Sequence, residues 1–132
     1  MHRNERCRFY EWVVEPASPK GKTPIFIHLK EQELYAFAGL CSFWGEGDNL
    51  KKTYTIITTE ANDFLKKYHD RMPVILSPDE EERWLDPSTD SGELQKLLDP
   101  FPADRMDAYE VSTIVNKPIN DTPECVKPVK AA

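Results

Sequence analysis

The chain has 132 residues, a mass of 15.3 kDa and a formal net charge of -6 at neutral pH. Its 39% hydrophobic and 30% charged residues are too apolar a mixture for a disordered protein, and its length fits one domain with a single modest core. The negative charge argues against a protein that wraps duplex DNA, because phosphate neutralisation requires clustered lysine and arginine. A local basic groove is still compatible with this composition.

The cysteines and the polar start of the chain indicate a cytoplasmic protein. Cys7, Cys41 and Cys125 are odd in number and form no CxxC pair, which is typical of free thiols in a reducing compartment. The first six residues lack the apolar stretch of a secretory signal, and no apolar run reaches membrane-spanning length. No histidine lies at zinc-ligand spacing from a cysteine or carboxylate cluster, so we expect no metal and no cofactor.

The first half of the chain predicts strands with short connections, which favours an antiparallel meander. The first strand carries apolar side chains on both of its faces, so we expect both faces to be covered. A tight turn near Glu31 and Gln32 should join the second strand to the third. The predicted strands are residues 7–14, 23–30, 33–40 and 53–58.

The periodicity then changes to that of helices. Thr58 or Thr59 can cap a helix whose last turn carries Lys66 and Lys67. Ser77-Pro78-Asp79-Glu80 is a capping box with proline at the first helical position, which predicts a helix to about Leu85. The remaining predicted elements are a buried strand at 73–76, a short helix at 90–98, a strand at 108–115 and an irregular tail at 117–132. The fold class predicted is α+β, a single domain over residues 1–132 with a mostly antiparallel, open barrel-like sheet and a few short helices.

Glu11 is the first candidate for a functional side chain. A lone glutamate in a strand usually faces solvent, but Phe9 and Val13 share the predicted face of Glu11, and Tyr10 and Trp12 flank it. A carboxyl group among apolar neighbours has a raised pKa, which suits it to donate or accept protons near neutral pH.

His69 and Arg71 follow directly on the predicted end of the helix. A histidine there more commonly stabilises the helix dipole, and Arg71 can equally form a structural salt bridge. The functional alternative makes His69 a proton-transfer partner of Glu11 and Arg71 a ligand for phosphate or carboxylate. No nucleophile with a comparable local signature is present, so the residues alone predict a site without a named reaction.

Two blocks taken together carry a resemblance to a known family. Phe9-Tyr10-Glu11-Trp12 followed by His69-Asp70-Arg71-Met72-Pro73 resembles the SOS response-associated peptidase (SRAP) family, the abasic-site DNA–protein crosslink proteins. Further matching pieces are Phe37-Ala38-Gly39-Leu40, Thr55-Ile56-Ile57-Thr58-Thr59-Glu60-Ala61, Val74-Ile75-Leu76 and Trp84-Leu85.

The resemblance implies a function on single-stranded DNA that contains abasic sites. In the family, a cysteine exposed after Met removal supplies an α-amine and a thiol, which close a thiazolidine on the aldehyde of the abasic sugar. The resemblance implies that Glu11 and His69 assist proton transfers, that Arg71 holds the DNA backbone and that Thr58 lines the same pocket. It also implies an associated autopeptidase activity and a role in the DNA damage or SOS response.

The chain departs from the family pattern at its start, because it begins Met1-His2 where the family begins Met-Cys. We therefore expect it to correspond to the carboxy-terminal part of the family domain and not to form the crosslink by itself. We also expect such a domain to be marginally stable or to need a partner segment.

Three functions remain open from the sequence, and whether the chain is an enzyme stays open with them. The first is sensing and shielding of abasic sites in single-stranded DNA through a covalent crosslink. The alternatives are a non-catalytic single-stranded DNA-binding or protein-interaction remnant, and a peptidase acting on other proteins through Glu11 and His69. The expected partner is abasic single-stranded DNA, without a membrane, in the cytoplasm and at the nucleoid during DNA damage.

Overall fold

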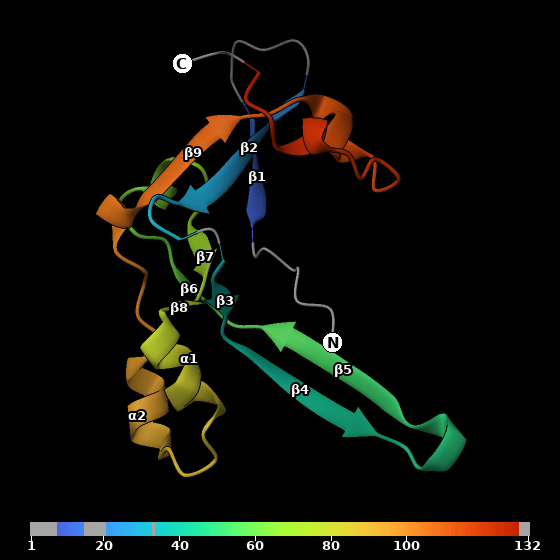
Figure 1. Ribbon diagram of the computed structural model, residues 1–132, viewed down its shortest axis with the longest axis vertical. Coiled ribbons are helices and arrows are strands. Elements are labelled where there is room, and N and C mark those ends of the chain that lie inside the picture. Colours follow the sequence, from blue (N-terminus) through green and yellow to red (C-terminus); the bar gives the residue numbers. More distant parts are fainter. Residues whose placement is uncertain (1–7, 15–20, 33, 130–132) are drawn as a thin grey trace.

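A three-stranded antiparallel sheet forms one end of the molecule (Figure 1). The computed structural model describes residues 8–14, 21–32 and 34–129. In the sheet, β2 lies between β1 and β9 and pairs antiparallel with both. Its strands are β1 (Phe9–Val14), β2 (Lys22–Leu29) and β9 (Met106–Glu110).

Three further strand pairs, all antiparallel, continue the molecule away from this sheet. They meet at three residues, each of which connects a strand of one pair to a strand of another. Ala38 follows β3, Ile57 follows β5 and Val74 follows β7. Ala38 donates its N–H to the Val74 carbonyl, Val74 to Ile57 and Ile57 to Ala38, each at 2.9 Å. The pairs are β3 (Ala36–Phe37) with β8 (Ile75–Leu76), β4 (Gly39–Trp44) with β5 (Lys51–Ile56), and β6 (Thr58–Glu60) with β7 (Arg71–Pro73).

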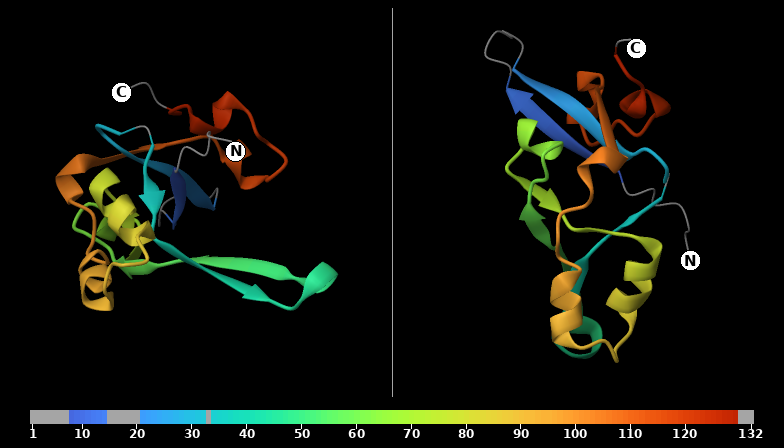
Figure 2. Two further views of the ribbon diagram at one scale, coloured as in Figure 1. Left: turned by 60° about the horizontal axis from the view of Figure 1, so that its bottom comes forward. Right: turned by 90° about the vertical axis from the view of Figure 1, so that its left-hand side faces the viewer.

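Two short helices lie at the opposite end from the three-stranded sheet (Figure 2). The capping box predicted from the sequence forms, with the Glu80 carboxylate accepting from the Ser77 N–H at 2.8 Å. The second helix is capped by Asp90, whose Oδ1 accepts from the Gly92 N–H at 2.7 Å. The helices are α1 (Pro78–Leu85) and α2 (Ser91–Lys96); 3₁₀ turns are η1 (Gly47–Asn49), η2 (Leu65–Lys67), η3 (Ala103–Arg105), η4 (Thr113–Asn116) and η5 (Pro123–Val126).

The hydrophobic core consists of two clusters. The larger lies between the three-stranded sheet and the β3–β8 and β6–β7 pairs, and the smaller lies beneath the helices. Burial of this apolar surface is the main stabilising contribution to the fold. The larger cluster contains Ile27, Leu29, Tyr35, Ala61, Leu65, Met72, Ile75, Phe101 and Met106; the smaller contains Ala38, Val74, Leu76 and Leu97.

The C-terminal segment covers the outer face of the three-stranded sheet. Tyr10 and Tyr109 donate their hydroxyls to the backbone carbonyls of Cys125 and Val126, at 3.2 and 2.7 Å. Trp12 donates its indole N–H to Asn116 Oδ1 at 2.6 Å. These bonds hold the segment against aromatic side chains whose polar atoms need partners once they are covered.

The structure confirms the predicted α+β class, and with it an open, mostly antiparallel sheet and few short helices. It corrects two element boundaries in the first half of the chain. The strand predicted at 33–40 does not form a hairpin with β2, because β3 pairs with β8 and the bonds at Ala38 separate β3 from β4. The helix predicted from a cap at Thr58 or Thr59 to Lys66 and Lys67 is not continuous. Its first residues form β6, because the β-branched Thr58 and Thr59 pair with β7, and only η2 near its end is helical.

Two smaller corrections concern coverage and strand length. The first strand is not covered on both faces throughout, since Val14 at its end is exposed. The strand predicted at 108–115 ends at Glu110, because Ser112 Oγ accepts the Ile114 N–H and starts η4. Cys7, the first residue of the strand predicted at 7–14, lies outside the described residues. No helix in the described part of the chain is long and apolar enough to cross a membrane.

Candidate proton-transfer site

Glu11 lies on the face of β1 that looks toward the core. It stands opposite Ile25 of β2, and its neighbour Phe9 stands opposite Ile27. Phe9 and Ile25 pack against the larger core cluster, so the half-buried Glu11 carboxyl is at the margin of that cluster. Burial raises the pKa of Glu11 above its ordinary value of 4.5, because desolvation penalises the charged carboxylate.

His69 lies in the turn between η2 and β7. The backbone carbonyl of Leu65 accepts the His69 backbone N–H at 3.0 Å. Because the side chain of Leu65 is buried, this bond holds the turn against the core. The ring atom Nδ1 lies 2.9 Å from the Arg71 backbone N–H, 3.1 Å from the Arg71 carbonyl and 3.1 Å from Asp70 Oδ1. All these contacts use one edge of the ring.

This environment provides a partner for Nδ1 in either protonation state. A neutral ring with its proton on Nε2 accepts the Arg71 N–H, whereas a protonated Nδ1 donates to Asp70 or to the Arg71 carbonyl. The ring can therefore gain and lose a proton without leaving its position, as a proton-transfer group requires.

The structure brings Glu11 and His69 into electrostatic contact although 58 residues separate them in the sequence. The charge of His69 lowers the pKa of Glu11 and so opposes the larger effect of burial. Glu11 and His69 therefore lie close enough for their charges to interact, as the members of an acid/base pair must.

Arg71 and Thr58 lie beside this pair on β7 and β6. Arg71 Nη2 donates to the Thr58 carbonyl at 2.7 Å and to Thr58 Oγ1 at 3.0 Å. Both residues are exposed, and only one guanidinium nitrogen takes part in these bonds. Since a guanidinium has five N–H donors, Arg71 can hold an anion while it remains bonded to Thr58.

All four site residues expected from the sequence thus lie in one neighbourhood: Glu11 with His69, His69 with Arg71, and Arg71 with Thr58. Sequence reasoning missed Asn62, which shapes the turn that carries His69. Asn62 Oδ1 accepts the Leu65 N–H at 2.9 Å, and Nδ2 donates to the Phe101 carbonyl at 2.6 Å. The sequence did contain a signal for this turn: Asn62 follows a β-branched strand, and asparagine favours turns.

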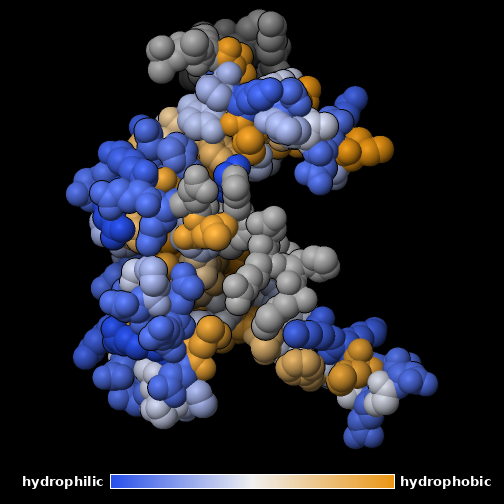
Figure 3. Space-filling model, viewed as in Figure 1, coloured by the Kyte–Doolittle hydropathy of each residue, from blue (hydrophilic) through white to orange (hydrophobic). Residues whose placement is uncertain are grey.

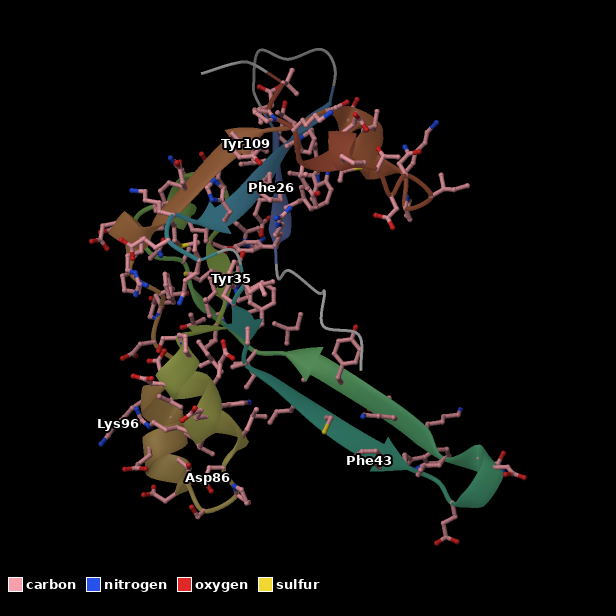
Figure 4. All side chains as sticks on the ribbon, viewed as in Figure 1. Phe26, Tyr35, Phe43, Asp86, Lys96 and Tyr109 are labelled. Atoms are coloured by element: carbon pink, nitrogen blue, oxygen red, sulfur yellow. The ribbon has the colours of Figure 1, made fainter. Side chains whose placement is uncertain are left out.

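The opposite face of the three-stranded sheet contains a separate cavity of about 330 Å³. Phe26 and Tyr109 line it, with ring centroids 5.1 Å apart, and Tyr35 lies at its side (Figure 4). Because side chains alternate along a strand, this cavity and Glu11 are on different sides of the sheet. Within the described residues no group of three or more His, Cys, Asp or Glu side chains could hold a metal ion.

Comparison with known proteins finds one matching family and relatives that share one name, abasic site processing protein. A family model described as SOS response associated peptidase (SRAP) matches residues 5–118. The chain is 49% identical over 122 residues to "Abasic site processing protein YoqW" of Bacillus subtilis (strain 168), covering 90% of this chain and 53% of the relative. It is 37% identical over 144 residues to "Abasic site processing protein HMCES" of Gallus gallus, covering 92% of this chain and 41% of the relative.

The fold also matches a solved structure of a protein from Bacteroides thetaiotaomicron. The TM-score is 0.80 at 35% identity, over 93% of this chain and 54% of that chain. The chain therefore spans about half the length of the curated relatives and of this structure. The family model covers most of the chain and both blocks that form the site, and the chain belongs to the SOS response associated peptidase (SRAP) family.

Proposed function

We propose that this chain supplies the proton-transfer and backbone-binding part of a site that processes abasic sites in single-stranded DNA during the response to DNA damage. The observation that carries the proposal is the convergence of a partly desolvated Glu11, a supported His69 and an exposed Arg71. The names of the curated relatives support the choice of abasic sites as substrate.

The chemistry suits this acid/base pair. An amine adds to the aldehyde carbon of a ring-opened abasic sugar, and a proton moves from nitrogen to oxygen to give a carbinolamine. Loss of water then needs an acid to protonate the departing hydroxyl group, a role that fits Glu11 because its raised pKa keeps more of it protonated. His69 accepts the proton of a thiol, whose sulfur bonds to the iminium carbon and closes a thiazolidine.

The nucleophile in this proposal comes from a polypeptide that begins with cysteine. Cys7, Cys41 and Cys125 have their α-nitrogens in peptide bonds in this sequence, so none of the three offers a free α-amine beside its thiol. Arg71 holds a backbone phosphate next to the lesion, and the Thr58 hydroxyl fixes the guanidinium. Phosphate contacts of this kind carry no sequence preference.

The experiment supplies the nucleophile as a small molecule. Cysteine methyl ester has the α-amine and thiol of an N-terminal cysteine. It is incubated with an abasic single-stranded oligonucleotide, with and without the chain, and thiazolidine formation is followed by mass spectrometry. We expect the chain to accelerate the reaction and Glu11→Gln to lose that acceleration by about a hundredfold, the usual contribution of general acid–base catalysis.

The matched control is Glu93→Gln, which removes an exposed carboxylate on α2 and should leave the rate unchanged. A wild-type chain that binds the oligonucleotide without accelerating the reaction would favour the single-stranded DNA-binding alternative. A chain that neither accelerates the reaction nor binds the oligonucleotide contradicts the proposal.

A further inference from the structure

The β4–β5 hairpin projects from the body of the molecule (Figures 1 and 3). Every residue from 40 to 56 is exposed, although this segment contains many large apolar side chains. Tyr54 is 82% exposed and Trp44 70%. An isolated two-stranded hairpin is marginally stable in water, and contiguous exposed apolar side chains are typical of an interaction surface.

Both faces of the hairpin carry exposed apolar side chains, with Leu40 and Trp44 on one face and Phe43, Tyr54 and Ile56 on the other. Cys41 stands opposite Tyr54, and Phe43 stands opposite Lys52, so all four share a face with Ile56 at its base. Figure 4 shows Phe43 on the part of β4 that projects from the rest of the molecule. We refer to Cys41, Phe43, Tyr54 and Ile56 as the hairpin face.

The hairpin is specified by its own sequence in spite of this exposure. Gly45 has φ +91°, and a side chain there would bring its Cβ within 2.5 Å of the Asn49 carbonyl oxygen. At the base, a Cβ on Gly39 would lie 2.8 Å from the Thr55 carbonyl oxygen. These glycines fix a turn and a close backbone approach in an element whose residues 40–56 are all exposed.

The outer edges of β4 and β5 are also unpaired, because each of the two strands pairs only with the other among the described residues. An open sheet edge presents backbone donors and acceptors to an extended polypeptide. Together with the hairpin face, it forms a surface of the kind that binds a peptide by strand addition, with alternate side chains in apolar contact.

Charge argues for a polypeptide rather than DNA or a second copy. Within residues 40–56, Lys51 and Lys52 are balanced by Glu46 and Asp48, so the hairpin has no net attraction for phosphate. Pairing of β5 with β5 of a second copy would bring lysines together, and edge lysines are a common device against such self-association. The whole chain carries -6, which adds to the repulsion between copies.

The comparisons indicate what that polypeptide is. The family model includes the hairpin, yet this chain spans only 53% of the Bacillus subtilis relative and 54% of the Bacteroides chain. We propose that the hairpin face and its open edge dock an extended apolar segment from the half of the SRAP domain that lies outside this match. The proposal rests on exposure and family membership and does not depend on the chemistry of Glu11.

The test uses the full chain and, as a separate polypeptide, the part of the Bacillus subtilis relative that this chain does not match. Binding is measured by isothermal titration calorimetry. We expect wild-type chain to bind, and Phe43→Ser/Tyr54→Ser to bind about a hundredfold more weakly, since each large apolar side chain loses its burial. Ile119→Ser removes an equally exposed apolar side chain, 88% exposed in the C-terminal segment, and should leave affinity unchanged.

Hydrogen exchange gives a second measurement that does not depend on the variants. Amides of residues 40–56 should gain protection when the added polypeptide binds. Absence of binding to wild-type chain, undiminished binding of the double variant, or unchanged exchange in the hairpin would each overturn the proposal. The proposal would also be overturned if the double variant still bound the polypeptide but lost a dimer formed by the wild-type chain. Loss of an abasic-oligonucleotide complex, with polypeptide binding unchanged, would overturn it in the same way. Glu11→Gln should bind normally, which separates this result from the proposed reaction.

Discussion

The three-stranded sheet and the β4–β5 hairpin are both antiparallel and rich in aromatic and β-branched residues, but their surroundings are opposite. Ile27, Leu29 and Met106 of the sheet are buried in the core, whereas every hairpin residue from 40 to 56 is exposed. The sheet therefore depends on tertiary burial, and the hairpin depends on its turn and its backbone pairing. The difference separates the part that folds for this chain's own stability from the part available to a partner.

The largest effect should come from one substitution made in both regions. Leu65 is fully buried in the larger core cluster, so we expect Leu65→Ala to lower the free energy of unfolding by about 2–5 kcal/mol. Leu50→Ala at the exposed end of the hairpin should change it by less than about 0.5 kcal/mol. Urea unfolding followed by circular dichroism measures both values, and equal losses would contradict the contrast between the regions.

A smaller and local effect is expected at the hairpin turn. Gly45→Ala places a Cβ against the Asn49 carbonyl at a positive φ, so hairpin opening should become easier by about 1–3 kcal/mol. The global free energy of unfolding should barely change, because residues 40–56 of the hairpin are exposed. Hydrogen exchange of amides 40–56 measures the local term.

Gly47→Ala is the matched control for that experiment. Gly47 has φ +55°, but its Cβ would meet no atom within 4 Å, so its effect should be smaller than that of Gly45→Ala. A global destabilisation by Gly45→Ala as large as that of Leu65→Ala would show that the hairpin is coupled to the core after all.

The smallest effect concerns the pH dependence at Glu11. Because the pKa of Glu11 is raised in the folded state, the folded chain binds its proton more tightly than the unfolded chain does. Its stabilising contribution is thus complete below the ordinary value of 4.5 and is lost as pH rises through the folded pKa. The free energy of unfolding of wild-type chain should fall relative to Glu11→Gln over that interval and then run parallel to it.

The same titration should appear in the proposed reaction, where the rate falls as Glu11 loses its proton. Measuring unfolding and rate over one pH series tests whether a single group controls both. Identical pH profiles of stability for wild type and Glu11→Gln would mean that Glu11 is not desolvated, and would remove the physical basis of its role as an acid.

The site could be anticipated from the sequence more fully than the fold around it. Glu11 among apolar neighbours predicted a raised pKa, and the motif order predicted His69, Arg71 and Thr58 as its companions; their proximity needed coordinates. Asn62 was missed because its bond to the Phe101 carbonyl joins segments 39 residues apart, and no local pattern encodes such a bond. The assignment of catalytic and DNA-binding roles to these residues stays a prediction.

The sequence by itself determined the elements whose signals are local. Ser77, Pro78 and Glu80 specify the start of α1, because a capping box satisfies its donors within four residues. Gly45 similarly specifies the hairpin turn through a backbone conformation that other residues avoid.

Only the tertiary structure decided where strands divide and which groups meet. The division between β3 and β4 follows from Ala38, Ile57 and Val74 bonding to one another, and β6 is a strand because β7 is there to pair with it. Isolated helix formation is weak, so a β-branched segment with an available strand partner adopts the strand. The coupling of Glu11 to His69 has the same origin: long-range packing brings their charges together.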